Sequence, residues 1–191
     1  ASQSRVPSPV TILFVHGGGF VLGGLESHDD LCAELAQRSG CQLVAVHYRL
    51  APEHPHPAAY DDVVAVAAAL CAEGPVVLVG DSAGATLCAA LAGTRADLGI
   101  RGQVLIYPWL GSPPVGGSFE AHAHAPMLAR DDLTLYDRAL GGAAEDPRRC
   151  PIRGDLARLP PTRLFAADCD PLCDDAGRYA AAARGQGARD I

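Results

Sequence analysis

The sequence predicts an α/β protein with a mostly parallel central sheet that is covered by helices on both faces. Two observations predict this class. Five short apolar runs lack the polar alternation of half-exposed strands, and segments with helical spacing of apolar residues separate them. Strands that are buried on both sides and connected through helices form parallel sheets between two helical layers.

The expected strands are leucine-rich or β-branched runs bounded by glycine, proline or polar residues. The first, VTILFV, ends just before His16. QLVAVHY, PVVLVG, GQVLIYPW and TRLFAAD are the others in chain order. Together the expected strands cover residues 11–15, 42–48, 75–80, 102–109 and 162–168.

The expected helices lie between these strands. The first is expected to begin near Ser27, because Ser27 precedes Asp30 by three residues and Leu31, Leu35 and Ala36 follow as an apolar stripe. The later helices have apolar residues at helical spacing, and the one after the third strand is rich in small residues. They are expected over residues 57–73, 84–93, 131–140 and 171–184.

The segment 110–160 differs from the rest of the chain because it is rich in Pro, Gly, Ala and His and contains one helical piece. A long irregular insertion at the carboxyl edge of a parallel sheet is where a lid or a pocket wall belongs. No internal repeat and no second domain is visible. We therefore expect one domain over residues 1–191, with a pocket- or lid-like insertion at 110–160.

Composition and charge narrow the choice of partners. The 191-residue chain has a formal net charge of −7, which argues against nucleic-acid and anionic-membrane partners, and no run approaches the length of a membrane span. Its seven cysteines form no C-x-x-C pair and favour a reduced, cytoplasmic location. His122 and His124 lack an accompanying cysteine or carboxylate pattern, so no metal or cofactor is expected. The oligomeric state is not indicated.

The pentapeptide GDSAG, residues 80–84, follows an expected strand and opens an expected helix. In this context the pattern G-x-S-x-G predicts a nucleophile elbow, in which Ser82 stands on a strained turn. Larger residues at Gly80 and Gly84 would clash with that turn. The amino end of the following helix would direct its positive dipole at a developing oxyanion.

The pentapeptide HGGGF, residues 16–20, follows the first expected strand. An oxyanion hole needs backbone N–H groups directed at empty space, and side chains at those positions would block the substrate. The alternative is a simple glycine-rich turn. The downstream Ser82 favours the oxyanion-hole interpretation, because the two motifs are partners in one reaction.

The chain resembles the hormone-sensitive-lipase-like family of α/β-hydrolases, which includes many bacterial acetyl esterases and carboxylesterases. The resemblance spans about residues 10–187 and implies an α/β-hydrolase fold that is incomplete at both ends. Its motifs occur in the family's order: HGGGF (16–20), YRLAPEHPHPAAYDD (48–62), GDSAG (80–84), LIYPWL (105–110) and DPLCDD (170–175).

The resemblance implies a role for each site residue. Ser82 resembles the nucleophile, and the amides of Gly18, Gly19 and Ala83 resemble the oxyanion hole. Gly17 mainly shapes the turn, although it belongs to the same motif. The implied activity is that of a serine carboxylesterase acting on small, short-acyl esters through an acyl-enzyme intermediate.

Asp170 resembles the acid of the catalytic triad. It could instead cap the following helix, because Pro171 suits the first helical position. Asp168 is the fallback acid. The DPL pattern and the chain order, serine before aspartate, favour Asp170.

Other residues have structural interpretations or depart from the family pattern. His16 is expected to hold the glycine loop, and His54 and His56, between prolines, are expected on a stiff surface loop. The family usually has an aspartate at His47 and an aromatic residue at His56. The aromatic residues expected near a modest apolar pocket are Phe20, Trp109 and Phe119.

The triad base should be a histidine that follows the acid. All seven histidines of the chain precede Asp170. Either the chain is a fragment, which we favour, or it is a protein without its base. The chain as it stands is therefore predicted to be close to inactive. The rival interpretation is a ligand-binding protein on a hydrolase scaffold, although the intact GDSAG, HGGGF and DPL motifs argue against it.

Overall fold

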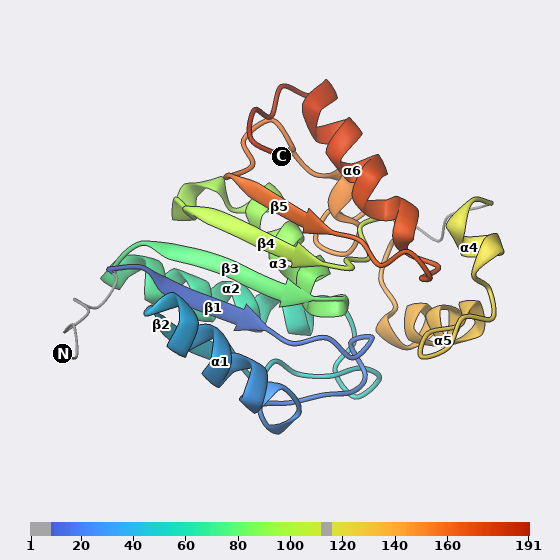
Figure 1. Cartoon of the computed structure of the whole chain (residues 1–191), viewed down its shortest axis with the longest axis horizontal. Helices are drawn as coiled ribbons and strands as arrows, with labels where there is room; N and C mark the ends of the chain where they lie inside the picture. Colours follow the sequence, from blue (N-terminus) through green and yellow to red (C-terminus); the bar gives the residue numbers. More distant parts are fainter. Residues whose placement is uncertain (1–8, 112–115) are drawn as a thin grey trace.

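The fold is built on a five-stranded parallel sheet (Figure 1). The computed structural model describes residues 9–111 and 116–191. The strands lie in the order β2-β1-β3-β4-β5. Their bounds are β1 Thr11–Val15, β2 Gln42–Val46, β3 Val76–Asp81, β4 Gly102–Ile106 and β5 Thr162–Phe165. The prediction of a parallel α/β sheet is confirmed.

The first strand lies inside the sheet because its residues are apolar on both faces. It pairs with β2 on one side and with β3 on the other, in parallel register. Leu13 and Val15 belong to one hydrophobic cluster, and Ile12 and Phe14 belong to a second. Alternate residues of a strand point to opposite faces, so the sheet separates two cores.

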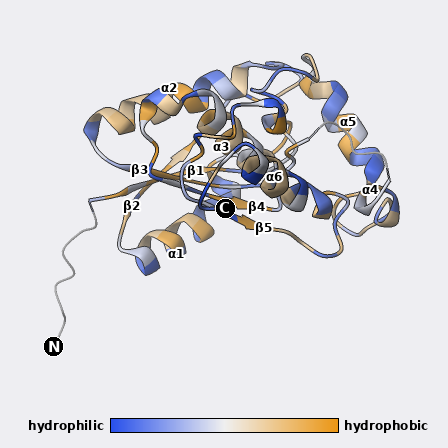
Figure 2. Cartoon of the chain, turned by 90° about the horizontal axis from the view of Figure 1, so that it is seen from above, coloured by the Kyte–Doolittle hydropathy of each residue, from blue (hydrophilic) through white to orange (hydrophobic). Residues whose placement is uncertain are grey.

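The helices cover both faces unequally (Figure 2). Helix α1 (Asp29–Ser39) packs on the face of Ile12 and Phe14, through Cys32. The larger cluster, on the opposite face, contains buried residues of α2 (Ala58–Glu73), α3 (Ala83–Thr94) and α6 (Cys173–Gly185). Leu133 and Leu140 of α5 (Arg130–Leu140) also belong to it. Ten of the twelve residues of α3 are buried, which explains its small, apolar composition.

Most of the segment 110–160 lies beyond the carboxyl ends of the strands, at one end of the sheet (Figure 1). It contains α4 (Ser118–Ala121), α5 (Arg130–Leu140) and the 3-10 helix η3 (Pro151–Arg153). Two further 3-10 helices are η1 (Glu26–His28) and η2 (Ala96–Leu98). Residues 112–115 of the segment lie outside the described residues.

Element types agree with the sequence prediction, but several strands end earlier than expected. The expected strand 102–109 ends at Ile106, because Tyr107 has a φ of 37°. A positive φ breaks the extended backbone that a ladder requires. The expected strands 42–48 and 162–168 end at Val46 and Phe165. The shortened ends leave room for the loops at the carboxyl edge of the sheet.

In the described part of the chain, no helix combines the length and the apolar character needed to cross a membrane.

Candidate active site

Ser82 stands on a strained turn between β3 and α3. Its φ and ψ are 48° and −120°, a conformation that costs a non-glycine residue about 1–3 kcal/mol. Two contacts hold it there: the Ser82 N–H donates to the carbonyl oxygen of Ile106 at 2.8 Å, and the Thr86 N–H donates to the Ser82 carbonyl at 3.0 Å. Backbone strain that is retained this way is typical of a functional turn.

The two glycines of the elbow lie against backbone. A Cβ atom at Gly84 would overlap the carbonyl oxygen of Val15, and one at Gly80 would stand 2.7 Å from the carbonyl carbon of Gly84. Real Cβ atoms do not approach backbone so closely, so both positions require glycine. The elbow therefore packs directly onto the end of β1, where the glycine loop begins.

The glycine loop, residues 16–20, is held by contacts with Tyr48 and Asp81 and by one contact within the loop. The Tyr48 hydroxyl donates to the His16 carbonyl at 2.8 Å, and the two rings stack with centroids 4.2 Å apart. Nδ1 of His16 donates to the carbonyl of Gly17 at 2.8 Å. The Gly17 N–H donates to Oδ1 of Asp81 at 2.9 Å. Burial is the main reason that the pKa of His16 is lowered, so its ring is neutral and structural.

The glycines of this loop have backbones that other residues rarely adopt. Gly18 and Gly19 have φ values of 120° and 61°. A Cβ at Gly18 would overlap the carbonyl of Leu22, and one at Gly19 would overlap the ring of Tyr136. Within residues 9–111 and 116–191, no hydrogen bond occupies the N–H of Gly18 or Gly19. Both amides therefore remain available as donors.

One cavity of about 420 Å³ joins the two motifs. Ser82 is half-buried and lines this cavity together with Gly18, Gly19 and Asp170. Tyr107 and Tyr136 form further parts of the wall. The segment 110–160 contributes Pro126, Met127, Leu128 and Tyr136 to the lining. The cavity has the size of a site for a small ligand.

The two candidate acids differ in position. Asp170 lines the cavity, whereas Asp168 is exposed. Oδ1 of Asp170 accepts the Leu172 N–H at 2.7 Å, so this carboxylate also supports the start of α6. Burial, with a smaller contribution from Asp175, raises the pKa of Asp170. Asp170 is half-buried and lines the same cavity as Ser82, so an imidazolium placed between them would stabilise its charged form.

The comparisons with known proteins agree with the observed fold. A family model described as alpha/beta hydrolase fold matches residues 12–189. The chain belongs to the α/β-hydrolase family. Its resemblance to the bacterial esterases of this family is confirmed by relatives named esterase, acetyl-hydrolase and acetyl esterase.

Two curated α/β-hydrolase relatives and one solved structure illustrate the similarity. The chain is 37% identical over 194 residues to "Esterase LipI" of Mycobacterium tuberculosis, covering 92% of this chain and 59% of that protein. It is 38% identical over 178 residues to "Acetyl-hydrolase" of Streptomyces hygroscopicus, covering 87% and 59%. EstE1, a thermostable carboxylesterase cloned from a metagenomic library, superposes with a TM-score of 0.89 at 30% identity, covering 99% of this chain and 70% of that one. The chain thus spans about three fifths of the length of these curated relatives.

The aromatic residues expected at the pocket are not those that line the cavity of Ser82. Phe20 and Trp109 are buried in the main core, and neither they nor Phe119 line the cavity of Ser82. Tyr107 and Tyr136 line it instead. Tyr107 belongs to the LIYPWL motif, but its local sequence does not predict that its ring is exposed. Tyr136 lies in α5, and the position of this helix places its ring at the cavity.

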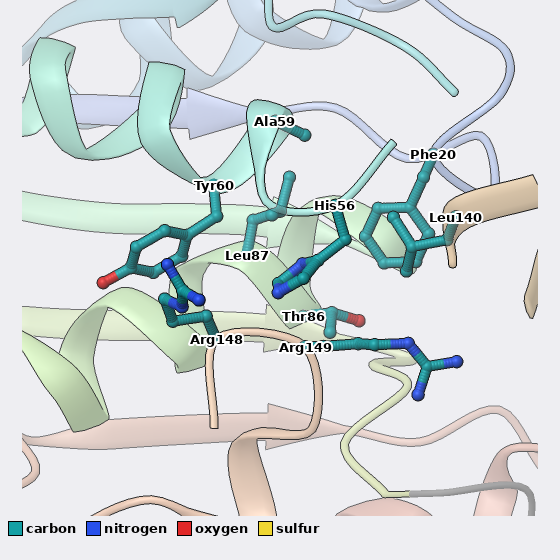
Figure 3. A pocket seen from close by; sticks show the side chains of 9 residues that line it. All are labelled: Phe20, His56, Ala59, Tyr60, Thr86, Leu87, Leu140, Arg148 and Arg149. Atoms are coloured by element: carbon teal, nitrogen blue, oxygen red, sulfur yellow. The ribbon is translucent and has the colours of Figure 1, made fainter. Parts of the chain in front are cut away.

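His56 also lies elsewhere than expected. It is not on the surface of its loop: its side chain is only 6% exposed, and Nε2 donates to Oδ2 of Asp146 at 3.0 Å. His56 is one of the residues that line a small second cavity, of about 10 Å³ (Figure 3). His54, by contrast, is exposed as expected. The His56–Asp146 contact connects the loop before α2 to the residues after α5.

Among the residues described, no cluster of three His, Cys, Asp or Glu side chains could hold a metal ion.

The hydrogen bonds of Asp146 predict that the stability of the fold decreases in acid. Hydrogen bonds from Arg148, and secondarily from His56, hold the pKa of Asp146 far below its ordinary value. A lowered folded-state pKa stabilises the fold above about pH 4, the ordinary value, and this contribution is lost as pH falls further. In thermal unfolding, Asp146→Asn should lower Tm at pH 6, and the deficit should shrink towards pH 2.5. Asp131→Asn, at an exposed position on α5, serves as the control. A deficit that is the same at both pH values would contradict the prediction.

Proposed function

We propose that the full-length gene product is a serine carboxylesterase that hydrolyses small, short-acyl carboxylic esters. The observation that supports this most strongly is the shared cavity, in which Ser82 faces the same space as the unoccupied amides of Gly18 and Gly19. The relatives named esterase and acetyl-hydrolase support the same reaction class. A cytoplasmic location, expected from the cysteine content, is part of the proposal.

In the proposed mechanism Ser82 attacks the ester carbonyl. As the Oγ–C bond forms, a histidine base takes the hydroxyl proton, and the carbonyl electrons move onto oxygen. The amides of Gly18, Gly19 and Ala83 stabilise this oxyanion, while Gly17 keeps the loop in shape through Asp81. The alcohol leaves with the proton from the base. Water then attacks the acyl-enzyme by the same route and releases the acid.

The proposal assigns Asp170 to orient the base and to stabilise its charged form. Since every histidine of this chain precedes Asp170, none follows the family's order of serine, acid and base. We therefore expect the 191-residue chain, assayed alone, to be close to inactive. Loss of the base costs a triad enzyme about 10⁶-fold in turnover.

The size of the cavity supports small substrates. At about 420 Å³ it lies near the lower end of small-molecule sites. Tyr136 covers Gly19, and Tyr107, the residue after β4, lines the same cavity as Ser82, so large groups on the ester would meet two rings. Esters of acetate and butyrate are therefore the proposed substrate class.

The deciding experiment is an assay of the full-length gene product with p-nitrophenyl acetate and p-nitrophenyl butyrate. Turnover should be lost to background in Ser82→Ala, because the covalent intermediate requires the hydroxyl. The 191-residue chain should show only residual turnover. Absence of Ser82-dependent hydrolysis in the full-length protein would reject the proposal and favour a ligand-binding protein on the same scaffold.

A further inference from the structure

The turn that carries Asp170 is bonded to a buried serine of the segment 110–160. Ser118, the first residue of α4, is 8% exposed, and α4 lies beside the amino end of α6 (Figure 1). The Ser118 N–H donates to Oδ2 of Asp174 at 2.8 Å, and its hydroxyl oxygen accepts the Asp174 N–H at 3.1 Å. The hydroxyl proton is donated to the carbonyl oxygen of Pro171 at 2.9 Å. Because an N–H only donates and a carbonyl only accepts, the direction of each bond is fixed.

One peptide group connects the Ser118 hydroxyl to the Asp170 carboxylate. The Pro171 carbonyl and the Leu172 N–H belong to the same peptide group, which is planar and rigid. Its carbonyl accepts the Ser118 hydroxyl, and its N–H donates to Oδ1 of Asp170 at 2.7 Å. A hydrogen bond to the carbonyl also polarises the group and strengthens donation by its N–H. Ser118 therefore acts on the orientation of the Asp170 carboxylate through a single rigid unit.

The Leu172 N–H matters for the function assigned to Asp170. Burial raises the pKa of Asp170, and the hydrogen bond from Leu172 opposes this by favouring the charged form. In the described part of the chain, the Asp170 carboxylate accepts no other hydrogen bond. A triad acid has to be ionised and fixed in direction in order to orient its histidine. Any freedom of the peptide group after Pro171 would therefore weaken both properties.

A neighbouring contact holds α6 in place independently of Ser118. Asp175, in the first turn of α6, is 2% exposed. Its Oδ2 accepts the N–H of Leu110 at 2.9 Å and the N–H of Gly111 at 3.2 Å. Loss of the Ser118 hydroxyl should therefore leave α6 docked and loosen only the turn before it.

We propose that Ser118 is a positioning residue of the active site, whose hydroxyl fixes the peptide group that holds the Asp170 carboxylate. Ser118 does not line the cavity of Ser82 and acts through Asp170. The segment 110–160 then has two roles, because it lines the cavity and also holds the turn of the acid. The effect on rate rests on the proposed esterase function. The hold on the turn does not, and it can be tested apart from any activity.

The first test is amide hydrogen exchange, measured by NMR on the full-length gene product. Ser118→Ala should accelerate exchange of the Leu172 amide about tenfold, as expected when local opening breaks one hydrogen bond fewer. This amide donates to Asp170 and not to Ser118, so the effect reports the orientation of the peptide group. An unchanged exchange rate of Leu172 in a folded variant would overturn the proposal. Ser118→Cys, a weaker donor of similar shape, should have a smaller effect in the same direction and replaces the alanine variant if that does not fold.

The matched control is Ser39→Ala. The Ser39 hydroxyl also donates to a backbone carbonyl, that of Leu35 at 2.6 Å, and accepts a backbone N–H, that of Cys41 at 3.2 Å. It is exposed at the end of α1 and contacts no part of the site. This variant should leave both the exchange of Leu172 and the rate of hydrolysis as in the unaltered protein.

The second test is a double-mutant cycle on the hydrolysis of p-nitrophenyl acetate. Ser118→Ala should lower kcat about tenfold and leave KM within about twofold. In an Asp170→Asn background, the same substitution should change kcat less than about twofold, because the acid that Ser118 positions is already lost. An unchanged kcat in Ser118→Ala, or an equal loss in both backgrounds, would overturn the proposal. Absence of Ser82-dependent turnover would instead reject the esterase function, and the exchange of Leu172 would then decide the role of Ser118 in the turn.

Discussion

Replacing Gly84 with alanine is expected to destabilise the fold by about 3 kcal/mol or more, because the new methyl group would collide with backbone. The Cβ would overlap the carbonyl oxygen of Val15 and stand 2.6 Å from its carbonyl carbon. Val15 cannot move away, since β1 is paired on both sides, with β2 and β3. Relief would require α3 to lift from the sheet, and α3 is almost entirely buried.

Urea unfolding followed by circular dichroism would measure this change. The matched control is Gly177→Ala, at an exposed position inside α6 where a Cβ would meet nothing within 4 Å. That substitution should stabilise the protein by about 0.5–1 kcal/mol, because glycine is a poor helix former. A Gly84→Ala protein within about 1 kcal/mol of the unaltered one would show that the elbow tolerates a side chain, contrary to the structure.

The parts of this architecture that the sequence predicts best are those set by local chemistry. The apolar runs that became strands and the small-residue helix α3 are explained by burial on both sides of a sheet. The glycines at 80 and 84 were expected because a sharp turn with a serine at its centre has no room for side chains, and the contacts at both positions confirm that reason. Strand ends were less predictable. Strand β4 ends at Ile106 because Tyr107 has a positive φ, and the carbonyl of Ile106 accepts a hydrogen bond from the Ser82 N–H.

The parts of the site that escaped prediction depend on contacts between distant segments. Tyr136 lies over Gly19 although 117 residues separate them in the numbering, because α5 folds back across the carboxyl edge of the sheet. The contact of Ser118 with the Pro171 carbonyl joins α4 to the turn before α6. His56 was expected at the surface because prolines flank it, yet its partner Asp146 comes from a loop whose course no local pattern specifies. Roles carried over for Ser82, Asp170 and the loop amides stay predictions.

Replacing Asp170 with asparagine is expected to lower kcat of the full-length gene product for p-nitrophenyl acetate by about 10⁴-fold, the loss seen when a triad acid can no longer stabilise its imidazolium. Asparagine keeps an oxygen that can accept the Leu172 N–H, which Oδ1 of Asp170 now accepts at 2.7 Å. The start of α6 should therefore remain supported, and Tm should change little.

The matched control for Asp170→Asn is Asp168→Asn, two residues earlier, exposed and outside the cavity. It should leave kcat within about threefold. Asp170 could be the triad acid, or it could only support the start of α6. If it only supports the helix, Asp170→Ala should lower Tm and Asp170→Asn should keep its kcat. A large loss of kcat in Asp168→Asn, with Asp170→Asn fully active, would transfer the acid to Asp168. That outcome would also mean that the loop before α6 rearranges on binding, because Asp168 now faces solvent rather than Ser82.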